Sequence, residues 1–309
     1  MTKSTIGIDI SKDHLDAHRW PDNKSCRVSN DAVGHKTLIR WIGRVECIAF
    51  EATGGYHAAL EKALHRAGLP VSKLNPTRVR RFAQAVGTQA KTDRVDAALI
   101  ARMVAMLEPA PDALKPQILA DLQELQFARA ALIRNRTAAQ NRTGRLTLAL
   151  LRRQHARTLK AIERDLAELD AAIAALIAGD TLLARRAAIL CSIPGVSIVT
   201  AAAILAGMPE IGALEPGAAA SLAGVAPFSR ESGRWKGVAR IGGGRAGLRR
   251  ALYMPALTAA RFNPDLKAVY DRLRAKGKPA KVALTAVMRK LVILANTLIH
   301  DDRFWESRA

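Results

Sequence analysis

The sequence predicts an α/β domain followed by a mostly α-helical remainder, and three observations support this. Up to about residue 107, short apolar strand-like segments alternate with helix-like segments, which is typical of a mixed sheet flanked by helices. Pro109, Pro111 and Pro116 then interrupt the chain, as in a linker. Beyond them, residues 117–178 contain no proline and one glycine, which favours long helices. We therefore expect three parts: 1–110, an α/β domain; 111–185, a long helical segment; and 186–309, a mostly helical domain.

The net charge points to a polyanionic partner. The 309 residues include 48 Lys or Arg and 27 Asp or Glu, which gives a formal net charge of +21. Such an excess favours DNA or RNA as the partner. The three cysteines have no CxxC spacing, so neither a zinc site nor a disulfide framework is predicted.

The chain shows no sign of export or of membrane insertion. Its start lacks the apolar core of a signal peptide. The most membrane-like stretch, Val282–Ile299, is interrupted by Arg289 and Lys290. We expect a cytoplasmic protein, associated with the nucleoid when it binds DNA.

The N-terminal elements follow from local patterns. Apolar strands are predicted at 4–9, 15–20, 27–29, 47–51 and 69–74. Helices are predicted from an Asp31 cap to Trp41, over 57–67, from Asn75-Pro76 onward, and over 91–107. Two of the strands end in an acid, Asp9 and Glu51, and we expect the acids to gather at one edge of the sheet.

Four acids form a candidate magnesium site. Asp93 and Asp96 are three residues apart, so they share one face of the predicted helix and repel each other unless a cation binds. Together with Asp9 and Glu51 they would supply the oxygen ligands that Mg²⁺ prefers. The alternative is structural: Asp93 and Asp96 also suit the start of a helix capped by Thr92. The combination of all four favours the metal site.

The long helical segment carries two amphipathic stretches, one with apolar residues from Leu119 to Ile133 and one with apolar residues from Leu159 to Leu176. They predict either an antiparallel hairpin or a dimerising coiled coil. Arg134, Arg145 and Arg152 are predicted to lie near one side of the first helix, where they would contact RNA or DNA; a solvated face is the alternative.

Basic residues are concentrated toward the C-terminus. Between Ala226 and Lys290 there are 16 Lys or Arg and three acids, a surplus of 13. Upstream, Ile193–Ile204 has the pattern of a helix-hairpin-helix element, which binds phosphate through backbone N–H groups, although Ser197 replaces the usual second glycine. An ordinary packing unit of two helices is the alternative. The candidate nucleic-acid contacts are Arg230, Arg234, Lys236, Arg240, Arg245, Arg249 and Arg250.

Ser232 is the candidate nucleophile. It lies between Arg230 and Arg234, whose charges would stabilise its alkoxide and the charge at a phosphorus centre. Ser221 and Ser229 are alternatives by position, and an inert loop serine is the structural alternative. No histidine lies nearby, so a Ser-His-Asp triad is not supported. His14 and His18 are predicted to be surface residues.

These residues now indicate a family. The element order and the acids resemble the RNase H-like fold of RuvC-type nucleases. The whole chain resembles the DEDD transposases of bacterial insertion sequences, which join a RuvC-like domain to a C-terminal serine transposase domain. The matching motifs are Gly7–Asp9, Phe50–Tyr56, Lys91–Asp96, Ile193–Gly195, Leu222–Pro227, Ser232–Gly233, Leu248–Tyr253 and Lys278–Lys281.

The resemblance implies a particular chemistry. Asp9, Glu51, Asp93 and Asp96 would bind Mg²⁺, and Ser232 would attack the DNA backbone to form a phosphoserine link; its Arg-Glu-Ser-Gly context favours it over Ser229. A non-coding bridge RNA from the element would pair with donor and target DNA. The protein would act as a dimer or tetramer whose sites combine the acids of one subunit with the serine of another.

Two other functions remain open from the sequence. One is a RuvC-like structure-selective nuclease, such as a junction resolvase, in which water attacks and Ser232 only contacts phosphate. The other is a basic nucleic-acid-binding protein without catalysis, whose acids are structural.

Overall fold

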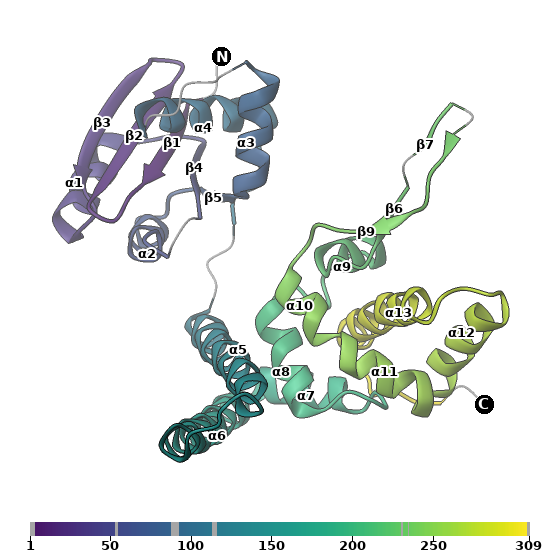
Figure 1. The fold of residues 1–309 in the computed structure, drawn as a ribbon. Coiled ribbons are helices and arrows are strands. Elements are labelled where there is room, and N and C mark those ends of the chain that lie inside the picture. The colour runs from purple at the N-terminus through teal and green to yellow at the C-terminus, as the bar shows by residue number, and fades with distance from the viewer. Residues whose placement is uncertain are drawn as a thin grey trace. The chain divides into compact units, whose positions relative to one another are not determined.

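The computed structural model describes residues 4–52, 55–87, 93–112, 116–229, 231–233 and 235–307. The chain forms two compact units, residues 1–114 and 115–309 (Figure 1). The division of the chain into three parts at 110 and 185 stays a prediction.

The first unit is built on a five-stranded mixed sheet, as predicted. Its strands are β1 (Thr5–Ile10), β2 (His14–Trp20), β3 (Lys24–Ser29), β4 (Cys47–Glu51) and β5 (Val71–Leu74), in the order β3-β2-β1-β4-β5. β1, β2 and β3 form an antiparallel meander, whereas β4 and β5 continue from β1 in parallel. β1 and β4 are therefore central strands.

Helices cover both faces of this sheet (Figure 1). On one face, α1 (Ala32–Ile42) and α2 (Ala58–Arg66) pack against apolar residues such as Ile6, Ile8 and Phe50. On the other face, α3 (Pro76–Ala85) and α4 (Asp93–Leu107) pack against Cys47, Ala49 and Leu74. Because side chains alternate along a strand, each residue of β1 and β4 belongs to one of these two layers.

Local chemistry fixes where the helices begin. Asp31 accepts hydrogen bonds from the backbone N–H groups of Val33 and Gly34 and so caps α1, as predicted. Asn75 accepts one from Thr77 and caps α3. Thr92, the predicted cap of α4, lies outside the described residues.

Gly7 allows α4 to approach the sheet closely. A Cβ atom at this position would lie 2.2 Å from the carbonyl oxygen of Ala97 and 2.3 Å from the backbone nitrogen of Ala101. Thr5, on the same face of β1, donates a 2.9 Å hydrogen bond to the carbonyl of Ala101. α4 therefore lies directly on β1 and runs antiparallel to it.

The second unit begins with two long helices that form an antiparallel hairpin. α5 (Gln117–Thr143) and α6 (Ala149–Ala178) are joined by a short turn, and Arg129 bonds Asp170 across them through both carboxylate oxygens, at 2.5 and 3.3 Å. The prediction that Arg145 and Arg152 extend the first helix was wrong, because α5 ends at Thr143 and is capped by Gly144. Arg145 lies in the turn and Arg152 lies on α6.

The remaining helices share one apolar core with α13 (Ala280–His300). They are α7 (Thr181–Cys191), α8 (Ile198–Gly207), α9 (Pro216–Leu222), α10 (Ala246–Ala251), α11 (Tyr253–Phe262) and α12 (Pro264–Ala275). α13 is long and apolar enough to cross a membrane, but ten of its residues are buried in the core of this unit. It is therefore the central core helix.

A narrow β-hairpin arm projects between α9 and α10 (Figure 1). At its base, β6 (Pro227–Phe228) pairs with β9 (Arg240–Ile241). Farther out, β7 (Glu231–Ser232) pairs with β8 (Trp235–Lys236), and Ser232 is opposite Trp235. Gly244 closes the base, where a Cβ would meet the backbone nitrogen of Gly224 at 2.4 Å.

Candidate active site

Asp9 and Glu51 lie on neighbouring strands at the same end of the sheet. The parallel pairing of Ile8 with Phe50 makes Asp9 and Glu51 the next residues in register, toward the carboxyl ends of β1 and β4. Both follow Gly7 and Ala49 by two positions, so they belong to the layer that α4 covers. Both acids therefore lie at the carboxyl ends of adjacent strands, as expected from their positions at the tips of two predicted strands.

The first turns of α4 lie toward the same end. Along β1, Thr5 meets Ala101 and Gly7 meets Ala97, so the next residue on that face, Asp9, is directed toward the start of the helix. Asp96 lies in this part of α4 and is half-buried. The backbone of Asp93 begins α4, and its side chain lies outside the described residues.

The four acids have the oxygen ligands that suit a divalent cation. Among the described side chains, which leave out that of Asp93, no three His, Cys, Asp or Glu residues converge closely enough to hold a metal ion. Asp9, Glu51 and Asp96 each make another interaction. Their shared face and their carboxylate oxygens fit a magnesium ion in type and direction.

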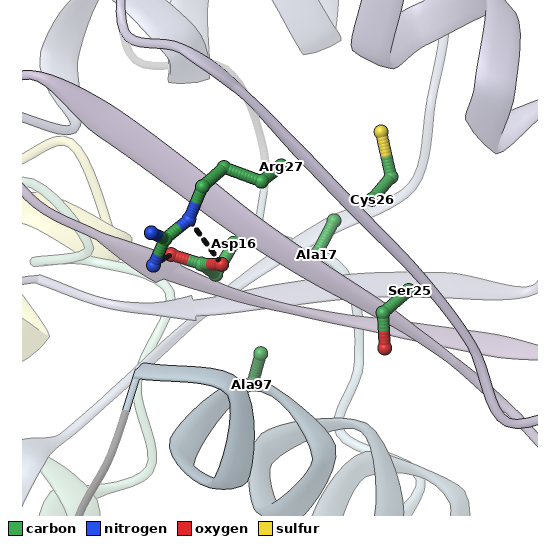
Figure 2. Close-up of a pocket in the computed structure, with 6 residues that line it drawn as sticks. All are labelled: Asp16, Ala17, Ser25, Cys26, Arg27 and Ala97. Atoms are coloured by element: carbon green, nitrogen blue, oxygen red, sulfur yellow. Dashed lines mark hydrogen bonds and ion pairs between the residues drawn. The ribbon is translucent and has the colours of Figure 1, made fainter.

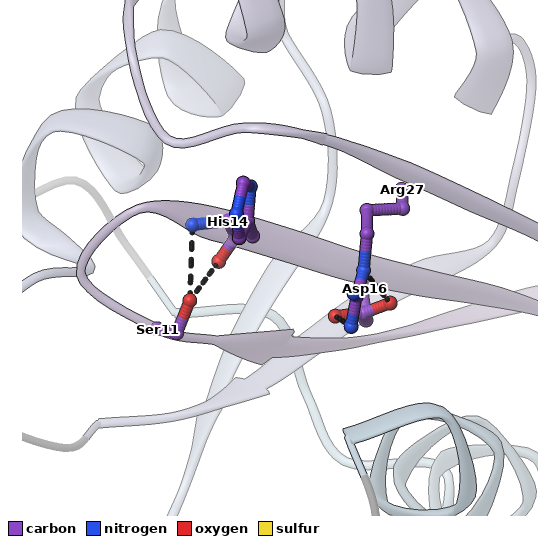
Figure 3. Close-up of polar contacts among 4 residues, drawn as sticks. All are labelled: Ser11, His14, Asp16 and Arg27. Carbon is purple, nitrogen blue, oxygen red and sulfur yellow. Dashed lines mark hydrogen bonds and ion pairs between the residues drawn. The ribbon is translucent and has the colours of Figure 1, made fainter.

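The sheet adds an acid and a base that the sequence analysis missed. Asp16 is opposite Asp9 in the β1–β2 register, and Arg27 is opposite Asp16 in the β2–β3 register. The Arg27 guanidinium donates two hydrogen bonds, of 2.9 and 2.8 Å, to the two carboxylate oxygens of Asp16 (Figures 2 and 3). Counting back through the tight Ser11–His14 turn would have paired residue 9 with residue 16.

A shallow cavity of about 280 Å³ lies beside this ion pair (Figure 2). It is lined by Asp16, Ala17, Ser25, Cys26, Arg27 and Ala97. Burial raises the pKa of the Cys26 thiol, and the Asp16 carboxylate raises it further, so this thiol is protonated at neutral pH. Burial also raises the pKa of Cys47, on the α4 side of β4, to about 11.

One histidine is placed differently from the prediction. His14 is exposed, as expected for a surface residue. His18 was also predicted at the surface, but it is only 7% exposed and its Nδ1 lies 2.9 Å from the Ser25 hydroxyl. The prediction for His18 was wrong because it lies on the α4 side of β2, where alternate residues face the helix.

Ser232 is exposed near the outer end of the arm, just before the turn residue Gly233. Ser229 is exposed in the same arm, and Ser221 is exposed on α9.

The predicted nucleic-acid contacts differ in how their side chains are engaged. Arg134, Arg145, Arg152, Arg240 and Arg250 are exposed, and Arg152 donates a 2.8 Å hydrogen bond to the carbonyl of Leu146. Arg245 instead makes a bidentate pair with Glu210, and Arg249 donates to the carbonyl of Gly243. Arg230, Arg234 and the side chain of Lys236 lie outside the described residues.

Known proteins resemble this chain over both units. Residues 6–150 match a family model for transposases of the DEDD IS110 type, and residues 187–271 match one described as the transposase IS116/IS110/IS902 family. The pilin gene-inverting proteins of Moraxella bovis and Moraxella lacunata are each 29% identical to it, over 100% of this chain and 99% of their own. A 43.6 kDa protein of insertion element IS110 from Streptomyces coelicolor is 34% identical over 50% of this chain and 37% of its own length.

The acid-bearing α/β unit, the basic helical unit and these relatives together define a DNA transposase or recombinase. Two matched models in the expected order cover most of the chain. The chain belongs to the IS110 family of transposases.

Proposed function

We propose that this transposase cuts and rejoins DNA through a phosphoserine intermediate at Ser232, with a magnesium site formed by Asp9, Glu51, Asp93 and Asp96. The observation that carries the proposal is the alignment of Asp9 and Glu51 on neighbouring strands, on the face that the start of α4 covers. An apolar core layer has no need of two adjacent carboxylates, which repel one another. A cation would turn that repulsion into binding.

The acids would hold the cation and position the phosphate. Bound Mg²⁺ would stabilise the negative charge that builds up on the phosphate oxygens. The acids are arranged on rigid elements, β1, β4 and α4, in a RuvC-like α/β domain of residues 1–110. Such rigid support is what an accurately positioned metal site requires.

Ser232 would act as the nucleophile. Its Oγ would form a bond to phosphorus while one ester bond to deoxyribose breaks, and the released hydroxyl would take a proton. Because the phosphoserine keeps the ester, attack by a second DNA hydroxyl would restore a phosphodiester and release the serine without ATP. An exposed serine on a projecting arm is well suited to reaching a phosphate held elsewhere.

Assembly and guidance complete the proposal. The helical segment 111–185 would join subunits into a dimer or tetramer, so that the acids of one subunit work with the Ser232 of another. The domain of residues 186–309, with its helix-hairpin-helix-like turn before α8, would hold nucleic-acid backbone. A bridge RNA would select donor and target DNA by base pairing, leaving the protein to bind charge and shape.

The full-length relatives support a site-specific reaction. They are named for inverting a pilin gene, and inversion requires two breaks and two rejoinings. A covalent intermediate suits such a reaction, since strands remain attached while they are exchanged.

A trapping assay tests the proposal. Full-length protein, Mg²⁺, labelled element-junction DNA and RNA from the flanking non-coding region are combined and run on a denaturing gel. We expect a labelled band at protein mass that Ser232→Ala and Asp9→Asn both abolish. Ser229→Ala, in the same arm, is the matched control and should keep the band.

Other outcomes lead to different functions. Cleaved DNA without an adduct, unchanged in Ser232→Ala, would indicate a hydrolytic nuclease of the resolvase type. An adduct that survives Ser232→Ala but not Ser229→Ala or Ser221→Ala would move the nucleophile. DNA binding with no cleavage, unaffected by Asp9→Asn, would leave a non-catalytic binding protein.

A further inference from the structure

We propose that Asp16 and Arg27 form a positioning pair that tunes the cation affinity of the acidic site. Asp16 would add negative potential beside Asp9. Arg27 would hold the Asp16 carboxylate in place and reduce the attraction of this carboxylate for the cation. This inference rests on the proposed metal site and assigns it two residues outside the four acids.

The geometry is a row of charges across four strands of the sheet. The register places Arg27 beside Asp16, Asp16 beside Asp9, and Asp9 beside the position of Glu51. Residues directly opposite each other on neighbouring strands share one face. The row is therefore one cation followed by three carboxylates, on the face covered by α4.

The Asp16 carboxylate is unusual for a surface ion pair. Its side chain is 15% exposed, whereas that of Arg27 is 56% exposed. It stands opposite another carboxylate, an arrangement that is unfavourable without a counter-charge. Arg27 supplies this charge through two hydrogen bonds, the strong geometry for an Arg–carboxylate pair. A neutral residue at position 16 would avoid the problem, so the acid favours a role in the site.

The order of the two charges determines the sign of their effect. Neighbouring strands lie about 4.8 Å apart, so Asp16 is one strand closer to Asp9 than Arg27 is. A dication near Asp9 is therefore attracted by Asp16 more than it is repelled by Arg27. The pair is neutral as a whole, but the register puts its negative member, Asp16, on the strand next to Asp9 and its positive member on the strand beyond.

The pair can be tested by measuring Mn²⁺ binding to the full-length protein without DNA. Titration calorimetry and the loss of the free Mn²⁺ electron paramagnetic resonance signal give the affinity. Thermal unfolding with and without Mn²⁺ gives the stability. The variants are Asp16→Asn, Arg27→Gln, the two combined, and the exchange of Asp16→Arg with Arg27→Asp.

The two single variants should change the Mn²⁺ affinity in opposite directions. Asp16→Asn should weaken Mn²⁺ binding about tenfold, and Arg27→Gln should tighten it about threefold. Arg27→Gln should also lower the unfolding temperature of the metal-free protein, and added Mn²⁺ should restore it. The exchanged pair keeps the same ion pair in the same register but puts the cation beside Asp9. It should retain stability and bind Mn²⁺ more weakly than Asp16→Asn does.

A purely structural pair would behave differently. If Asp16→Asn and the exchanged variant bind Mn²⁺ as the unaltered protein does, the pair only fastens β2 to β3 and the inference is overturned. If Asp16→Asn fails to fold, the exchanged variant still decides the question. Asp9→Asn distinguishes failure of the positioning pair from failure of the proposed metal site. Equal Mn²⁺ binding with and without Asp9 would refute the metal site itself.

Discussion

Gly7 controls the distance between α4 and the sheet, and so the position of the acids. Its missing side chain lets the backbone of Ala97 and Ala101 approach β1 to within a distance that no Cβ tolerates. Asp9 is two residues further along the same face. A shift of the helix away from Gly7 would therefore separate Asp93 and Asp96 from Asp9 and Glu51.

We expect Gly7→Ala to destabilise the protein by about 3 kcal/mol, because the clash is with backbone atoms that cannot rotate away. Gly144→Ala is the control, since its φ is −69° and no atom lies within 4 Å of the added Cβ. It should change the free energy of unfolding by less than about 1 kcal/mol. Urea unfolding measures both, and equal stabilities would refute the close contact.

At the scale of elements, the α5–α6 hairpin carries arginines of two kinds: some bond the opposite helix, and others are exposed to solvent. Arg129 is 18% exposed and bonds Asp170 on the opposite helix. Arg134, further along α5, is exposed. The two arginines are on one helix yet should have different roles.

Arg129→Ala should lower the free energy of unfolding by about 1 kcal/mol, the usual range for an ion pair that is partly solvated. Arg134→Ala should leave the free energy of unfolding within about 0.5 kcal/mol of the original value but weaken the binding of RNA. Thermal unfolding and filter binding, applied to both variants, check that one variant loses stability and the other loses RNA binding. Loss of RNA binding in Arg129→Ala alone would reverse the assignment.

For the whole molecule, the charge is distributed unevenly. Residues 115–309 carry 31 Lys or Arg and 15 acids, a surplus of 16 out of the total of 21. The α/β unit, which holds the four acids of the proposed site, carries the remaining surplus of five, from 17 Lys or Arg and 12 acids. Binding of nucleic-acid backbone should therefore depend mainly on the second unit.

DNA affinity should fall by about a thousandfold between 50 and 200 mM salt, because released counterions drive binding to phosphate. Arg250→Ala should reduce the slope of the log–log salt plot by about one. Arg245→Ala is the control, because the Arg245 guanidinium binds Glu210. This substitution should lower the free energy of unfolding and leave the slope of the salt plot nearly unchanged. Fluorescence anisotropy with labelled DNA measures this, and a flat plot contradicts it.

The sequence predicted the elements better than the contacts between them. Alternating apolar residues, the Asp31 and Asn75 caps and the long helices all followed local rules. The contact of Gly7 with α4 and the Asp16–Arg27 pair depend on register between segments, which composition and periodicity do not encode. The break at Gly144 was also missed in assigning Arg145 and Arg152, because a single glycine does not always end a helix.

The strict alternation along β1 has a consequence for how this protein tolerates genetic change. Ile6, Ile8 and Ile10 enter the core on one side, while Thr5, Gly7 and Asp9 face α4 on the other. Substituting Asp9 alters one acid of the proposed metal site and leaves both layers intact. Deleting one codon before Asp9 would turn the carboxylate into the apolar core and push an isoleucine under α4. In-frame deletions here should therefore abolish folding, whereas point changes should yield folded, inactive copies.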